Sequence, residues 1–186
     1  MLDKMFSPAG HKTFGAKFIE IGFTVFMMWF AMLVVVSFLN AVGLASIDIA
    51  NNMPILGFWP NQMLLSHHFT VSQMLSSPYA VMGVLITIAG APLLEEVLFR
   101  GICPALADEN GRLRPKLLLI VLAVSFIGFG LVHGHGYISV MIQGVGGLLL
   151  TMLWYRNGPS MRSSYFSGVA AHSLYNISCV LVVWML

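Results

Sequence analysis

The sequence predicts an all-α polytopic transmembrane bundle of about five membrane-spanning helices. Of its 186 residues, 58% are hydrophobic and only 9% are charged, whereas soluble domains contain about 25% charged residues. The mean hydropathy is +0.87. Five apolar runs reach the ~20 residues that a helix needs to cross the hydrocarbon core. A chain of this length is expected to form a single domain overall.

The first two apolar runs are 18–46 and 79–107. The first follows the short stretch MLDKMFSPAGHK and exceeds the ~7–15 apolar residues of a signal-peptide core, so we expect a retained membrane helix. A loop of about residues 47–78 separates the two runs and is expected on the outer side of the membrane. In this loop, His67 and His68 are adjacent and point to different faces of a helix, which argues against a shared metal ion.

The last three runs are 116–135, 137–156 and 165–186. The polar stretch DENGRLRPK precedes the first of them, and Pro115 suits the first turn of the helix that follows. An Asn-Gly-Pro turn within YRNGPSMRSS separates the last two runs. Each run is therefore bounded by residues that interrupt a helix or favour its start.

The basic residues predict the orientation in the cell membrane. With five spans, all nine Lys and Arg side chains fall on one side: Lys4, Lys12 and Lys17; Arg100, Arg112, Arg114 and Lys116; Arg156 and Arg162. The positive-inside rule makes that side cytoplasmic, with the N-terminus inside and the C-terminus outside. The net charge of +2 is small, and the basic residues form no patch with interleaved aromatics, so no nucleic-acid partner is expected.

Two adjacent glutamates lie inside the second run, in GAPLLEEVLFRG. Glu96 and Arg100 are one helical turn apart and can form an ion pair, whereas Glu95 lies ~100° further round the helix. This pattern favours Glu95 as a general base facing a cavity, although spacing alone does not decide between the two glutamates. Solvated glutamates at headgroup level are disfavoured because the apolar pattern resumes after the pair. Pro92 should bend the helix just before them.

Two further polar faces occur in later runs. The third run ends FIGFGLVHGHG, where Phe129 and His133 are four residues apart, and His135 is a substitute for His133 at the edge of a glycine-rich turn. The fifth run contains His172 and Asn176, again four apart and therefore on one helix face. A single intramembrane histidine often only joins two helices, but three polar faces in one small bundle indicate a functional site.

The three patterns together resemble the CPBP intramembrane proteases, the family of CAAX prenyl endopeptidases and Abi-type bacteriocin-processing and self-immunity proteins. That family shows EExxxR, FxxxH and HxxxN in this order, each on its own helix. The corresponding segments here are EEVLFR (95–100), FGLVH (129–133) and HSLYN (172–176). The resemblance covers about residues 79–180. We therefore divide the chain into an N-terminal helix with its outer loop, 1–78, and a four-helix catalytic core, 79–186.

The resemblance implies an intramembrane endopeptidase acting on membrane-associated, prenylated or leader peptides. The implied roles are water activation by Glu95 and His133, oxyanion stabilisation by His172 and Asn176, and support by Glu96, Arg100 and Phe129. No cofactor is certain. The set Glu95, His133 and His172 equals the ligand count of a catalytic zinc site, yet HExxH is absent. We favour a metal-free glutamate mechanism slightly, and leave a divalent metal such as zinc open.

Two other functions compete with the protease: a non-catalytic immunity or peptide-binding protein and, less favoured, a small proton-coupled transporter. Intact motifs favour the enzyme, and the lack of paired halves argues against the transporter. The expected partners are the lipid bilayer and a peptide or protein substrate. The sequence indicates neither the oligomeric state nor whether the substrate is prenylated.

One geometric difficulty accompanies this interpretation. Straight parallel helices would place His172, Glu95 and His133 at depths of ~13, ~18 and ~27 Å from the cytoplasmic surface, too far apart for one site. Helix tilt, a bend at Pro92, or an early stop of the third helix at HGHG would bring them together.

Overall fold

The computed structural model describes residues 12–44, 76–101, 103–108, 113–133, 136–157 and 161–185. Within these ranges the chain is helical and contains no β-strand. The elements in order are α2 (Phe14–Ala41), α6 (Pro78–Leu85), the π-helical η2 (Ile86–Gly90), α7 (Ala91–Arg100), α8 (Cys103–Leu106), α9 (Pro115–Val132), α10 (Gly136–Arg156) and α11 (Met161–Met185). The predicted all-α bundle is confirmed. The outer loop with His67 and His68, and also His135, lie outside the described residues.

Four segments among the described helices are long and apolar enough to cross a membrane: α2, the continuous stretch Pro78–Arg100, α9 and α10. The fifth predicted span corresponds to α11, which has 25 residues and therefore sufficient length. It is not among the four, and its sequence is interrupted by serines and by His172 and Asn176. The chain is thus a multi-pass membrane protein whose last long helix is more polar than the rest.

Helices α9 and α10 form a closely packed hairpin. A Cβ atom on Gly130 of α9 would lie 2.4 Å from the Cα of Val140, and one on Gly144 of α10 would lie 2.4 Å from the carbonyl oxygen of Phe126. Only glycine leaves room for such backbone contact between the two helices. The pair forms a rigid wall along which the other helices pack.

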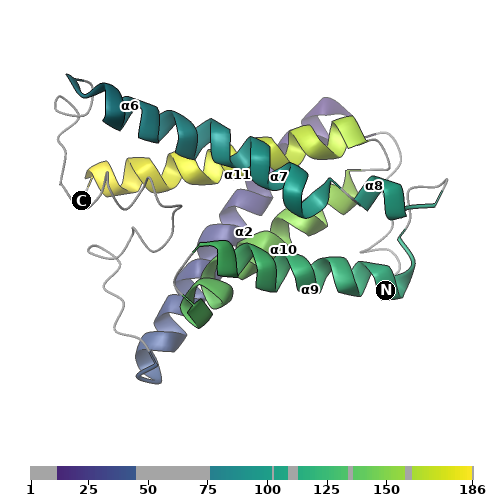
Figure 1. Cartoon of the computed structure of the whole chain (residues 1–186), viewed down its shortest axis with the longest axis horizontal. Coiled ribbons are helices and arrows are strands. Elements are labelled where there is room, and N and C mark those ends of the chain that lie inside the picture. Colours follow the sequence, from purple (N-terminus) through teal and green to yellow (C-terminus); the bar gives the residue numbers. More distant parts are fainter. Residues whose placement is uncertain are drawn as a thin grey trace.

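Helix α2 packs against α10 and α11, and the stretch α6–α7 runs alongside α11 (Figure 1). The contact between α2 and α11 includes the indole of Trp29, which donates to the Ser178 hydroxyl at 2.8 Å. Met28 of α2 lies in the same buried cluster as Phe129 and Tyr175. The N-terminal helix is therefore part of the core of the bundle.

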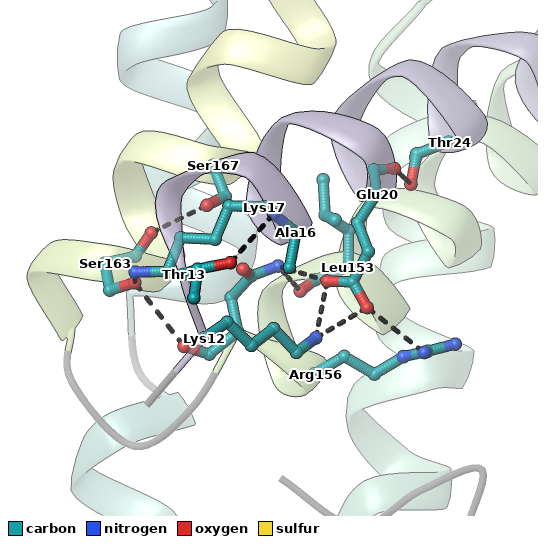
Figure 2. Close-up of polar contacts among 11 residues, drawn as sticks. Lys12, Thr13, Ala16, Lys17, Glu20, Thr24, Leu153, Arg156, Ser163 and Ser167 are labelled. Atoms are coloured by element: carbon teal, nitrogen blue, oxygen red, sulfur yellow. Dashed lines mark hydrogen bonds and ion pairs between the residues drawn. The ribbon is translucent and has the colours of Figure 1, made fainter. Parts of the chain in front are cut away.

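A polar cluster fixes the start of α2 to the adjoining ends of α10 and α11 (Figure 2). Glu20 accepts a hydrogen bond from Lys12 Nζ at 2.6 Å and pairs with Arg156 of α10 at 3.1 Å. Lys17 donates to the hydroxyl of Ser163 on α11 at 2.6 Å. These contacts join three helices at one end of the bundle.

Replacing Glu20 with glutamine is expected to lower the free energy of unfolding by about 1–2 kcal/mol. Most of this loss comes from Lys12, because the Lys12 and Glu20 side chains are only 13% and 20% exposed. The Arg156 side chain is 50% exposed, so solvent weakens its contribution. Unfolding of the purified variant in detergent measures the change, and an unaltered stability would show that these ion pairs contribute nothing.

Candidate active site

Helix α7 places both glutamates inside the bundle. Glu95 is 7% exposed, and Glu96 and Arg100 are fully buried, so the alternative of solvated carboxylates at headgroup level is wrong. Arg100 Nη1 donates to Glu96 Oε1 at 2.6 Å, which confirms the ion pair expected from their spacing. Because Arg100 lies in this site, it contributes no surface charge to the count of basic residues that predicted the orientation.

Arg100 is also held by α9 and α10. Its Nε donates to Thr151 Oγ1 at 3.2 Å and its Nη2 donates to the Gly147 carbonyl at 3.0 Å, while Ser125 Oγ lies 2.8 Å from Thr151 Oγ1. The guanidinium carbon stands 5.2 Å from the centre of the Phe129 ring, a cation–π contact. The sequence pattern does not single out Thr151, Ser125 and Gly147, because small and hydroxyl residues are common in membrane helices and mark no site by themselves.

His172 of α11 lies between the two carboxylates. Its Nδ1 is 3.3 Å from Glu96 Oε1 and its Nε2 is 3.8 Å from Glu95 Oε2, the latter longer than a direct hydrogen bond. Two carboxylates and one guanidinium carry a net charge of −1. Since an uncompensated buried charge is strongly unfavourable, the cluster is neutral only when it holds one further proton, on His172 or Glu95.

His133 terminates α9, as the sequence predicted for the HGHG segment. The helix ends at Val132, and the His133 backbone N–H bonds to the Gly130 carbonyl at 3.2 Å. Its Nδ1 lies 2.6 Å from the Phe129 carbonyl oxygen. A carbonyl can only accept, so Nδ1 carries a proton, and Nε2 is the acceptor nitrogen whenever the ring is neutral.

A small cavity brings the two histidines together. Its lining includes His133, His172, Asn176 and Gln143, with apolar walls from Met28, Phe129, Ile142, Gly146 and Tyr175, and it has room for about one water molecule. The Phe129 ring packs on both imidazoles, with centroid distances of 4.8 Å to His133 and 5.6 Å to His172. Glu95 is not part of the lining and approaches the cavity through His172.

The expected difference in depth does not keep these side chains apart. His172 touches both glutamates, and His133 shares its cavity. On α11, the Asn176 side-chain amide donates to the Thr87 carbonyl of η2 at 2.9 Å. A bend is expected at Pro92; what the structure contains there is the π-helical turn η2, which ends two residues before the proline.

The three candidate metal ligands, Glu95, His133 and His172, are not gathered around one point in the structure. In the parts of the chain that the structure describes, no three His, Cys, Asp or Glu side chains gather closely enough to hold an ion. Glu95 and His172 face each other, but the other nitrogen of His172 is directed at Glu96. Cys103 and Cys179 are free thiols. The residues as arranged do not fit a three-ligand zinc site, which needs donors at ~2.0–2.2 Å from one ion.

Glycine 168 of α11 is required for the burial of Glu96. A Cβ atom at Gly168 would lie 2.5 Å from Glu96 Oε2. Because Glu96 is already held by Arg100, we expect Gly168→Ala to destabilise the protein by about 1–3 kcal/mol through overpacking. Unfolding in detergent measures the loss. The matched control is Gly22→Ala on α2, where the added Cβ meets nothing within 4 Å; equal losses for both variants would contradict the prediction.

One known protein family matches the part of the chain that contains the candidate site. A family profile described as type II CAAX prenyl endopeptidase Rce1-like matches residues 77–178, more than half of the chain. The match contains all three motifs and leaves α2 outside. No curated protein and no solved structure matches the chain significantly.

Proposed function

Because the chain belongs to the Rce1-like family of type II CAAX prenyl endopeptidases, membrane-embedded proteases, we propose that it hydrolyses peptide bonds with Glu95 as general base. One observation carries this proposal: a carboxylate without an arginine partner is buried against a histidine that adjoins a cavity of water size. Glu96 is the less suitable base because its carboxylate is engaged by Arg100. A positioned carboxylate can accelerate a reaction ~10²–10⁴-fold through proton transfer.

The first step is attack of water on the peptide carbonyl. Because Glu95 does not line the cavity itself, this water must lie at the edge of the cavity nearest Glu95 during the reaction. There Glu95 takes one of its protons, and His133 Nε2 accepts its second hydrogen bond and orients it. The role of His133 is supported by the bond of its Nδ1 to the Phe129 carbonyl, which leaves Nε2 as an acceptor. When the C–N bond breaks, Glu95 returns its proton to the leaving amine, so protons balance over the cycle.

The oxyanion is stabilised by His172 and Asn176. With the additional proton of the cluster on His172, Nδ1 donates to Glu96 and Nε2 donates to the substrate oxygen. The Asn176 amide has two N–H groups, one of which is donated to Thr87, so the second remains for the oxyanion. Fixed donors in a site shielded from bulk water stabilise developing charge strongly.

The substrate class and membrane orientation belong to the same proposal. A prenylated or otherwise membrane-associated peptide fits the family to which the chain belongs. The basic residues outside the site support a cytoplasmic N-terminus. We propose 79–186 as the catalytic core, with α2 as an added wall of the cavity through Met28.

The test uses the purified full-length protein in detergent and a fluorogenic farnesylated peptide with a C-terminal CAAX sequence, compared with the same peptide lacking the lipid. Cleavage without any ion gradient supports the protease and contradicts the transporter. Binding of either peptide without cleavage would instead support the immunity or peptide-binding function. A chelator arm accompanies each assay: unchanged rates support the metal-free mechanism, and loss restored by zinc would overturn it.

A further inference from the structure

The helical turn before Glu95 and Glu96 has an unusual hydrogen-bond arrangement. In η2 the backbone N–H of Ala91 bonds to the carbonyl of Ile86, five residues earlier. In the same register the N–H of residue 92 would bond to the carbonyl of Thr87. Residue 92 is proline and has no N–H, and the Thr87 carbonyl instead accepts from Asn176 of α11 at 2.9 Å.

The Thr87 carbonyl is buried and therefore needs a hydrogen-bond donor from the protein. Thr87 is 1% exposed and Pro92 is also fully buried, so water does not replace the missing backbone donor. Buried carbonyls are almost always hydrogen-bonded because an unmet group is costly. The proline therefore creates an acceptor inside the bundle, and an amide from a different helix satisfies it.

We propose that Pro92, Thr87 and Asn176 form a latch in which Pro92 is a positioning residue for the active site. The missing N–H keeps the Thr87 carbonyl available, and the bond to that carbonyl fixes the plane of the Asn176 amide. The second N–H of a planar amide then has a defined direction. Pro92 thereby orients an oxyanion donor that belongs to a helix on the other side of the site.

A substitution at residue 92 tests the latch directly. In Pro92→Ala, a continued π-helical turn would pair the new N–H with Thr87, whereas an α-helical turn would pair the Ala91 N–H with Thr87. In both cases the carbonyl gains a backbone donor. The bond from Asn176 becomes redundant, whatever register the helix adopts.

The first readout is a double-mutant cycle on unfolding in detergent. Asn176→Ala should lower the equilibrium constant for folding by about fivefold or more in the parent protein and by clearly less in the Pro92→Ala background. The control is Pro78→Ala, because Pro78 lies in the first turn of α6, where the missing N–H has no helical partner. Equal effects of Asn176→Ala in all three backgrounds would overturn the latch.

The second readout rests on the proposed function and uses the farnesylated peptide. For Pro92→Ala we expect kcat per folded molecule to fall about tenfold with KM unchanged, since an oxyanion donor acts in the transition state. A purely structural role would lower the folded fraction and leave kcat of that fraction intact, which would overturn the positioning role. If the parent protein cleaves nothing, the proposed function fails, while the stability cycle still decides the latch.

Discussion

Replacing Glu95 with glutamine is expected to lower kcat for peptide hydrolysis at least ~100-fold, because the amide cannot take a proton from water. The fold should survive this change. Glutamine has nearly the same shape, and the substitution removes one of two buried negative charges, of which only that of Glu96 is paired with Arg100. The variant cluster is neutral without an additional proton. We therefore expect thermal stability to be unchanged or slightly raised.

Two matched variants sharpen this experiment. Glu20→Gln removes a carboxylate near the start of α2, outside the candidate site, and should leave kcat per folded molecule unchanged. Glu96→Gln removes the ion-pair partner of Arg100, and its main effect should be a lower free energy of unfolding. Full activity of Glu95→Gln, with loss of kcat in Glu96→Gln, would reverse the roles of the two glutamates.

The parts of the site that the sequence could predict are local along the chain. The ion pair of Glu96 and Arg100 follows from a spacing of one helical turn, and His172 and Asn176 share a face for the same reason. The break after Val132 follows from glycines that favour turns. Helix positions follow from apolar runs, because the membrane excludes unpaired backbone groups.

The remaining contacts join residues far apart in the sequence. Thr151 and Gly147 hold Arg100 from a helix that carries no motif. Pro92 predicts a bend in its helix. It does not predict that a π-helical turn forms there or that Asn176 donates to the Thr87 carbonyl. Such partners depend on how helices approach, and helix approach depends on close packing that spacing within one run does not encode.

For α2 as well, the sequence predicts the helix but not its contacts with distant parts of the chain. Its apolar length predicts a span, and the family match begins only at residue 77. The structure nevertheless places Met28 in the cavity lining and joins Trp29 to Ser178 of the helix that carries His172. A helix outside the recognisable core can therefore influence the site.

Replacing Arg100 with methionine is expected to have the largest effect on stability, a loss of about 3–5 kcal/mol. The substitution leaves the Glu96 carboxylate buried without its cation. It also removes the donors that Thr151 Oγ1 and the Gly147 carbonyl receive. The stability of Arg100→Lys should lie between those of the parent protein and Arg100→Met, because a lysine retains the charge but cannot reach three acceptors with one planar group. Unfolding of purified variants in detergent measures all three.

The double variant Glu96→Leu with Arg100→Met separates two contributions to this loss. Replacing a buried ion pair with apolar side chains is often neutral, so most of the stability lost in Arg100→Met should return. Activity should not return, because His172 Nδ1 then lacks the carboxylate that accepts from it. Recovery of stability without activity would mean that the Glu96–Arg100 pair serves to orient His172. Failure to recover stability would mean that the ion pair itself is needed to stabilise the bundle.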